Sequence, residues 1–311
     1  MIEDAAARIR RAIQTVIVGY DEAINLILTA VLCEGHVLIE DVPGTGKTTL
    51  AKALAQSLGS TFRRIQFTPD LLPSDITGLN IYNLKTQTFD FRPGPLLSQI
   101  VLADEINRAA PRTQSALLEA MQERQMTIDG ETRSLPRPFL ILATQNPVEL
   151  EGTFPLPEAQ LDRFLLRVKL GYPGEADENA ILQRFRRGDP LSDLAAVCDP
   201  ATIRALIEQV RDIRVEESVQ QYIVRLVRRS RDHADIALGA SPRAALALYR
   251  VSQAWAAIHG GTFVTPDDVK ATAPYVLTHR LVISPQMRVR GRSADEVIAD
   301  VVQSVPVPVD R

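Results

Sequence analysis

The sequence predicts an α/β fold in which a five-stranded parallel sheet, covered by helices on both faces, precedes an all-helical domain. Five short apolar segments alternate with helix-like segments in the first half of the chain, at 36–40, 62–67, 99–103, 139–143 and 164–170. Two of them, QIVLA and FLILA, are almost continuously apolar, which is typical of strands buried on both faces. Beyond residue 173 helical patterns dominate and strand patterns almost disappear.

Length and composition fit a globular protein with two domains. The chain has 311 residues, of which 45% are hydrophobic and 23% charged, enough for a substantial core without disulfides. The net charge of −3 provides no overall field that would attract nucleic acid or an anionic membrane. The most apolar run, at 23–33, is too short for a membrane span, and the N-terminus lacks a signal-peptide pattern. We therefore expect a cytoplasmic protein with no membrane span and no nucleic-acid partner.

The predicted domains are 1–173, which is α/β, and 174–311, which is all-helical. Two insertions interrupt the first domain, at about 70–95 and about 125–137, and both have hairpin patterns; the second contains Asp129-Gly130, a strong two-residue turn signal. Three helix starts in the second domain are marked by a capping side chain followed by proline, at Asp199-Pro200, Ser241-Pro242 and Thr265-Pro266.

A glycine-bearing segment, DVPGTGKT, joins the first predicted strand to the helix that follows. It matches the phosphate-binding pattern G-x-x-x-x-G-K-[ST] except that Asp41 replaces the first glycine. Gly44 and Gly46 allow backbone N–H groups to turn toward phosphate oxygens. Lys47 is expected at the outer phosphates and Thr48 at Mg²⁺, while the Asp41 carboxylate is expected to cap turn amides. The alternative is an ordinary strand-to-helix turn. The predicted nucleotide contacts are Pro43, Gly44, Thr45, Gly46, Lys47, Thr48 and Thr49.

Polar residues end two of the other predicted strands, where a parallel sheet places its ligand crevice. Asp104 and Glu105 follow the strand at 99–103 directly. We expect Asp104 to hold the Mg²⁺ shell and Glu105 to orient and polarise the attacking water. Asn146 ends the strand at 139–143 and is a candidate for contacting the terminal phosphate or the water. The alternatives are a surface acid pair at a helix start and an ordinary Asn-Pro turn.

Seven segments together resemble the MoxR-type AAA+ ATPases over nearly the whole chain: IVGYDEAI, EDVPGTGKTTLAKALA, RIQFTPDLLPSDITG, FRPGPLLSQIVLADEINRA, LLEAMQER, LATQNPVELEGTFPLPEAQLDRF and GASPRA. The resemblance implies an AAA+ P-loop NTPase fold, with the C-terminal helices as a lid. It also implies that the insertion at about 70–95 is the helix-2 insert and that the hairpin at about 125–137 is the pre-sensor hairpin. The family usually has glycine where this chain has Asp41.

The same resemblance implies roles for single residues. Asn146 resembles the first sensor, and Arg163 resembles the arginine finger that enters the neighbouring subunit's site. Arg243 resembles the second sensor, which reaches from the lid to the γ-phosphate. Val18 and Gly19 resemble the segment that packs against adenine.

At the level of the whole protein, the resemblance implies an ATPase that uses ATP and Mg²⁺ as a ring, with six subunits expected. It also implies a chaperone that remodels a partner protein, and partners of this family often carry a von Willebrand factor A domain. A magnesium-chelatase-type motor subunit would share every catalytic residue. An ATP-gated scaffold with little turnover and a P-loop phosphotransferase are further alternatives. An arginine cluster on one lid helix predicts a solvated face rather than a nucleic-acid site: Arg225, Arg228, Arg229 and Arg231.

Overall fold

The computed structural model describes residues 1–146, 152–186 and 188–308. Its central sheet consists of five parallel strands, β1 (Val37–Glu40), β2 (Phe62–Gln66), β5 (Ile100–Asp104), β8 (Leu140–Gln145) and β9 (Leu166–Val168). Their spatial order is β2-β5-β8-β1-β9, so β1 lies between β8 and β9. The predicted five-stranded parallel sheet is confirmed.

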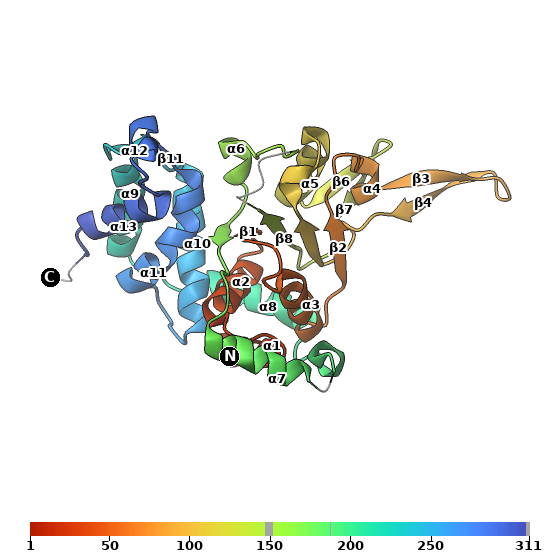
Figure 1. The fold of residues 1–311 in the computed structure, drawn as a ribbon, viewed down its shortest axis with the longest axis horizontal. Helices are drawn as coiled ribbons and strands as arrows, with labels where there is room; N and C mark the ends of the chain where they lie inside the picture. The colour runs from red at the N-terminus through yellow and green to blue at the C-terminus, as the bar shows by residue number, and fades with distance from the viewer. Residues whose placement is uncertain (147–151, 187, 309–311) are drawn as a thin grey trace.

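Helices cover both faces of this sheet (Figure 1). The helices in the first part of the chain are α1 (Ile2–Gln14), α2 (Asp21–Leu32), α3 (Lys47–Ser57), α4 (Pro73–Thr77), α5 (Pro111–Glu123) and α6 (Glu158–Leu161). Successive strand side chains point to opposite faces. In β1, for example, Val37 and Ile39 pack with α1, α2 and α3, whereas Leu38 packs with α5. This alternation explains why the inner strands β1, β5 and β8 read as almost continuously apolar.

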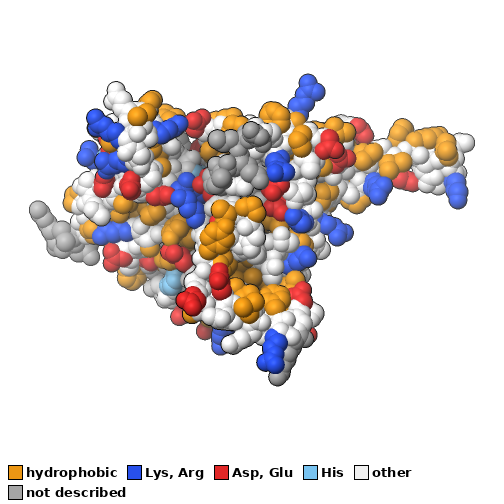
Figure 2. Space-filling model, viewed as in Figure 1, with side chains coloured by type: hydrophobic (Ala, Val, Ile, Leu, Met, Phe, Trp, Pro, Cys, Tyr) orange, Lys and Arg blue, Asp and Glu red, His pale blue; other side chains and the backbone are white. Residues whose placement is uncertain are grey.

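Both predicted insertions form hairpins. Strands β3 (Gly78–Asn83) and β4 (Thr88–Pro93) pair antiparallel, as do β6 (Gln125–Ile128) and β7 (Glu131–Ser134). The β3–β4 hairpin projects from the body of the molecule (Figure 1). Hydrophobic side chains lie along it (Figure 2), among them the exposed Leu84 and Phe89.

The C-terminal part is mainly helical, as predicted, with α7 (Glu175–Phe185), α8 (Pro200–Arg211), α9 (Glu217–Arg231), α10 (Pro242–Ile258), α11 (Pro266–Leu277), α12 (Pro285–Val289) and α13 (Ala294–Ser304). The three helix starts marked by proline are confirmed, because the side chains of Asp199, Ser241 and Thr265 each accept a hydrogen bond from their own helix. A small antiparallel pair, β10 (Ile236–Leu238) and β11 (Val282–Ile283), is an addition that the sequence pattern did not indicate.

The lid helices pack on the N-terminal helices, since α10 contacts both α2 and α1. This places α10 beside the sheet rather than over the carboxyl ends of its strands. The predicted boundary at residue 173 stays a prediction. Within the described residues, no helix is both long and apolar enough to cross a membrane.

Candidate functional site

The loop between β1 and α3 has the backbone that phosphate binding requires. Gly44 and Gly46 have φ angles of +86° and +81°, a region that favours glycine. Lys47 Nζ lies 2.8 Å from the Val42 carbonyl oxygen and 3.2 Å from that of Asp41, so its ammonium group is held over the loop. The loop leads directly into the N-terminus of α3, where unpaired N–H groups favour an anion.

Asp41, the departure from the usual pattern, behaves in part as expected. Its Oδ1 atom accepts a hydrogen bond of 2.8 Å from the Val42 backbone N–H, so it does cap a turn amide. The side chain is nevertheless buried, and Oδ2 has no hydrogen-bond partner among the described residues. Burial of the phenol raises the pKa of Tyr20, and the nearby Asp41 carboxylate adds to that rise.

A hollow of about 250 Å³ opens at the carboxyl ends of β1, β5 and β8. The predicted phosphate and metal residues line it together: Asp41, Pro43, Gly44, Thr45, Gly46, Lys47, Thr48, Asp104, Glu105 and Asn146. Mg²⁺ in phosphate sites usually takes one or two protein oxygen ligands and completes its shell with water and phosphate. Thr48 and Asp104 supply such a hydroxyl and carboxylate in the same hollow, and the Asp104 carboxylate already pairs with a cation, the guanidinium of Arg64. The donor set therefore fits Mg²⁺.

The acidic pair is held by a network that crosses three strands. Thr144 of β8 donates its hydroxyl proton to Asp104 Oδ1 at 2.6 Å and accepts a hydrogen bond of 2.8 Å from the Glu105 backbone N–H. Glu105 has a φ angle of +59°, a conformation that a non-glycine residue adopts only when its surroundings hold it there. Such strained residues concentrate at functional sites.

Two residues of β2 complete this network and were missed from the sequence. Arg64 donates two hydrogen bonds to Asp104 Oδ2, at 2.6 and 3.1 Å. Gln66 donates to Glu105 Oε2 at 2.7 Å and accepts from Arg64. The available signal was their i, i+2 spacing, which places both on one face at the end of a strand that enters the crevice.

A second hollow, of about 540 Å³, lies beside the phosphate pocket and is largely apolar. Val18, one of the two predicted adenine contacts, lines it together with Thr49. The other, Gly19, does not line this hollow but the neighbouring one on the other side of Tyr20. A side chain at Gly19 would collide with Asp177. Helix α7 and the segment before it supply most of the remaining wall, a contribution that the sequence did not reveal: Tyr172, Pro173, Glu178, Ile181, Leu182 and Phe185.

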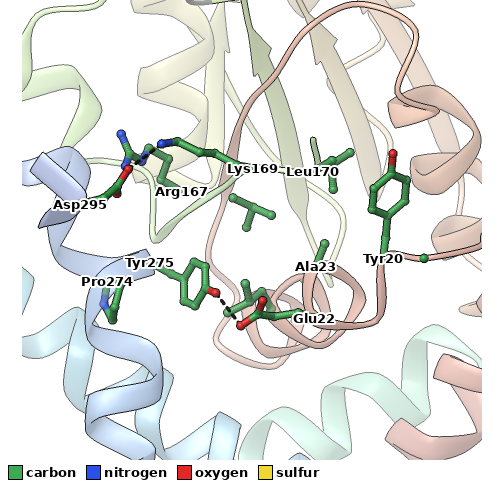
Figure 3. A pocket seen from close by; sticks show the side chains of 12 residues that line it. Tyr20, Glu22, Ala23, Arg167, Lys169, Leu170, Pro274, Tyr275 and Asp295 are labelled. Carbon is green, nitrogen blue, oxygen red and sulfur yellow. Dashed lines mark hydrogen bonds and ion pairs between the residues drawn. The ribbon is translucent and has the colours of Figure 1, made fainter. Parts of the chain in front are cut away.

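Tyr20 separates this apolar hollow from a third one, drawn in Figure 3. There Arg167 of β9 and Lys169, which follows that strand directly, point toward Asp295 of α13, each at 2.6 Å. Arg167 also pairs with Glu40 at 3.1 Å, so one guanidinium connects the end of β1 to the lid. Because the cations in this hollow are already paired with carboxylates, we interpret it as a joint between lid and core.

Arg163 and Arg243 lie together in a different place. They line a hollow at the amino ends of β1 and β9, next to His36 and Leu165, which we call the arginine face. The phosphate pocket lies at the carboxyl ends of the same strands. A strand of four or five residues separates the two edges by about 15 Å. The structure therefore places Arg243 away from the phosphate pocket of its own chain, because α10 packs beside the sheet and not over the crevice.

Comparisons with known proteins agree with this geometry. The family model described as "ATPase family associated with various cellular activities (AAA)" matches residues 36–166, and that of the AAA lid domain matches 228–301. The chain is 41% identical to the chaperone MoxR1 of Mycobacterium tuberculosis, covering 95% of this chain and 80% of that protein. This chain belongs to the MoxR family of AAA+ ATPases. The predicted family and fold class are thus confirmed.

Two other relatives are covered over a larger share of their own length than MoxR1 of Mycobacterium tuberculosis. The uncharacterized protein YeaC of Bacillus subtilis is 48% identical, covering 96% of this chain and 93% of YeaC. MoxR of Methylorubrum extorquens is 33% identical, covering 98% and 96% respectively. A crystal structure from Cytophaga hutchinsonii superposes with a TM-score of 0.93 at 36% identity, covering 99% of this chain and 96% of that one.

Proposed function

We propose that this chain hydrolyses Mg-ATP between identical subunits of a ring, expected to be a hexamer. One observation carries the proposal: the phosphate pocket and the two candidate catalytic arginines lie at opposite edges of the same sheet. An arginine side chain spans roughly half of the distance of about 15 Å that separates the edges. A second copy is therefore needed to bring an arginine face to each phosphate pocket.

In this proposal one chain binds the nucleotide. The apolar hollow takes the base, the amides and ammonium of the glycine-bearing loop take the phosphates, and Thr48 with Asp104 holds the metal. Mg²⁺, when bound, neutralises charge on the outer phosphates. Glu105 polarises the attacking water, and Asn146 orients the water or the terminal phosphate.

The neighbouring chain completes the reaction. Arg163 and Arg243 approach the outer phosphates from that chain and stabilise the negative charge that grows on the transferred group. Arginine fingers supplied by a partner contribute roughly 10³- to 10⁵-fold in rate. Hydrolysis is therefore expected to require assembly, and an isolated chain should bind nucleotide but turn it over slowly.

The output of this cycle is proposed to be chaperone-like remodelling or assembly of a partner protein in the cytoplasm. The relative in Mycobacterium tuberculosis is named a chaperone, which supports this class. A partner with a von Willebrand factor A domain remains an inference from family resemblance. A magnesium-chelatase-type motor would share the same residues, and a chelation assay with candidate partner subunits would distinguish it from the chaperone.

The proposal is tested by measuring steady-state ATP hydrolysis per subunit as the protein concentration rises through the assembly range. We expect turnover per subunit to rise steeply and then level off at full assembly. Glu105→Gln serves as the control, because it should assemble and bind ATP but hardly hydrolyse it. Turnover per subunit that does not depend on concentration, in a range where light scattering shows assembly, would exclude an interface site. Negligible turnover in the full ring would favour the ATP-gated scaffold.

A further inference from the structure

The arginine face contains a buried connection between core and lid that the proposed reaction does not yet use. Arg280, in the short 3₁₀ turn Thr278–Arg280, has a side chain that is only 3% exposed. Its Nε atom donates to Asp162 Oδ1 at 2.7 Å. The other carboxylate oxygen of Asp162 accepts a hydrogen bond of 3.2 Å from the hydroxyl of Ser241. One carboxylate thus joins two separate segments of the lid.

The candidate catalytic arginines lie on the segment of Asp162 itself and on one of the two lid segments that it joins, the start of α10. Arg163 follows Asp162 directly in the chain. Arg243 stands in the first turn of α10, two residues after Ser241, whose hydroxyl also caps that helix by accepting from the Ala244 N–H. Asp162 therefore fixes the backbone from which Arg163 projects and, through Ser241, the helix end from which Arg243 projects.

Arg280 holds the same backbone from the other side. It donates to the Phe164 carbonyl oxygen at 2.6 Å and to the Leu165 carbonyl oxygen at 3.2 Å. The guanidinium of Arg280 therefore binds the carbonyl groups that follow Arg163 in the chain, and it also pairs with Asp162, which precedes Arg163. Burial lowers the pKa of Arg280 to about 10, and the charge of Asp162 opposes that shift. A buried guanidinium needs such a counter-ion to stay in place.

We infer that Asp162 is a positioning residue that sets Arg163 and Arg243 as a pair, so that both enter the neighbouring copy's nucleotide site together. The inference rests on the proposed function, because it assumes that these arginines act on a neighbour. It adds that movement of the lid relative to the core moves both arginines at once. A change of about 1 Å in the position of a catalytic group can lower a rate by about 10²-fold.

The test uses the full-length assembled protein and two variants. Asp162→Asn keeps the shape of the side chain but removes the charge that Arg280 requires. Ser241→Ala keeps that ion pair and removes only the hydroxyl that joins Asp162 to α10. We expect turnover to fall about 10²-fold in Asp162→Asn and about 10-fold in Ser241→Ala, with ATP affinity unchanged within about twofold.

A matched control separates positioning from stability. Thr265 caps α11 in the same lid, as Ser241 caps α10, but it does not line the arginine face. Thr265→Ala should lower the melting temperature about as much as Ser241→Ala does and leave turnover at the wild-type rate. Equal losses of turnover in these two variants would overturn the inference, since the effect would then come from lid stability.

Mixed rings distinguish a fault in the arginine face from a fault in the phosphate pocket. A Lys47→Ala subunit cannot hold ATP but offers an intact arginine face to its neighbour. Mixing it with Asp162→Asn or Ser241→Ala subunits should restore hydrolysis above either variant alone. If Arg163→Ala is restored in this way but both Asp162→Asn and Ser241→Ala are not, the inference about Asp162 is wrong and the proposed function stands. If Arg163→Ala is not restored either, the proposed function itself fails.

Discussion

The phosphate pocket and the arginine face are built in different ways. The phosphate pocket is assembled from loop backbone and from side chains that hydrogen-bond across adjacent strands, such as Thr144 to Asp104. The arginine face depends on contacts between segments more than 100 residues apart, such as Asp162 and Arg280. A pocket made by one sheet edge is fixed once the sheet folds. A face made by core and lid together would change with any movement of the lid, so under the proposed function we expect it to be the part that responds to assembly and nucleotide state.

The largest expected effect comes from removing the cation of the phosphate pocket. Lys47→Ala should abolish measurable ATP binding, because the ammonium group that the loop carbonyls hold in place is lost. Isothermal calorimetry with Mg-ATP checks this. Lys52→Ala is the matched control, since that lysine lies on the same helix, is exposed and lines neither nucleotide hollow. Near-normal ATP affinity in Lys47→Ala would mean that the nucleotide binds elsewhere.

Removing the arginine finger should lower turnover but leave ATP binding intact, unlike the loss of Lys47. Arg163→Ala should lower turnover by roughly 10³-fold while ATP affinity and assembly remain normal, because the lost charge acts on a neighbour's transition state. Turnover by phosphate release, binding by fluorescent nucleotide titration and assembly by light scattering separate the three. Arg225→Ala, on the exposed side of α9, provides a control of equal charge change. If Arg163→Ala is assembled and as fast as wild type, the finger assignment is wrong.

Removing hydrogen bonds from the network that holds the acidic pair should lower turnover by an intermediate factor. The loss should affect only the phosphate pocket of the altered subunit. Thr144→Val keeps the side-chain shape but removes the hydrogen bonds to Asp104 and to the Glu105 backbone. Two such bonds at about 1 kcal/mol each predict a loss of turnover of about 30-fold. Thr144→Ser, which keeps the hydroxyl, should remain near the wild-type rate.

Mixed rings then sharpen the contrast between the two regions. Thr144→Val and Lys47→Ala both damage the phosphate pocket of their own chain, so a mixture of the two should show no restored activity. A mixture of Arg163→Ala with Lys47→Ala should show restored activity. Restoration in both mixtures would contradict the division of the site into a phosphate pocket and an arginine face.

The same contrast explains what the sequence could predict. The sheet was predictable because its inner strands are apolar on both faces, and the phosphate loop because DVPGTGKT is contiguous. Arg64 and Leu182 were missed because they reach the site from an edge strand and from a helix whose surroundings only the fold brings together. Arg163 and Arg243 could be assigned only by family resemblance. The distance of Arg243 from its own chain's phosphate pocket follows from the packing of α10 against α1 and α2, which the sequence did not reveal.

The smallest expected effect is that of mild acid, and we expect it to differ between the arginine face and the phosphate pocket. The buried His36 lines the arginine face, and the buried His279 contacts the Phe164 carbonyl oxygen just after Arg163. No histidine occurs among the described residues that line the phosphate pocket. His36 is held neutral, since its Nδ1 atom accepts from the Ile141 N–H while Nε2 faces the Met121 carbonyl oxygen. Burial lowers the pKa of His36 to about 4 and that of His279 well below its usual value.

Below pH 6.5 the unfolded chain takes up protons at these histidines and the folded chain does not, so acidification lowers the free energy of unfolding. For His36 the loss begins near pH 6.5, reaches about 3 kcal/mol near pH 4 and is absent above neutral pH. We expect turnover to fall between pH 6.5 and 5 before ATP binding does, because the arginine face loosens first. Parallel measurements of melting temperature, turnover and ATP affinity across this range test the order. His36→Gln, which cannot titrate, should make the melting temperature less dependent on pH over this range. If wild type loses ATP binding and turnover at the same pH, the two regions do not loosen separately.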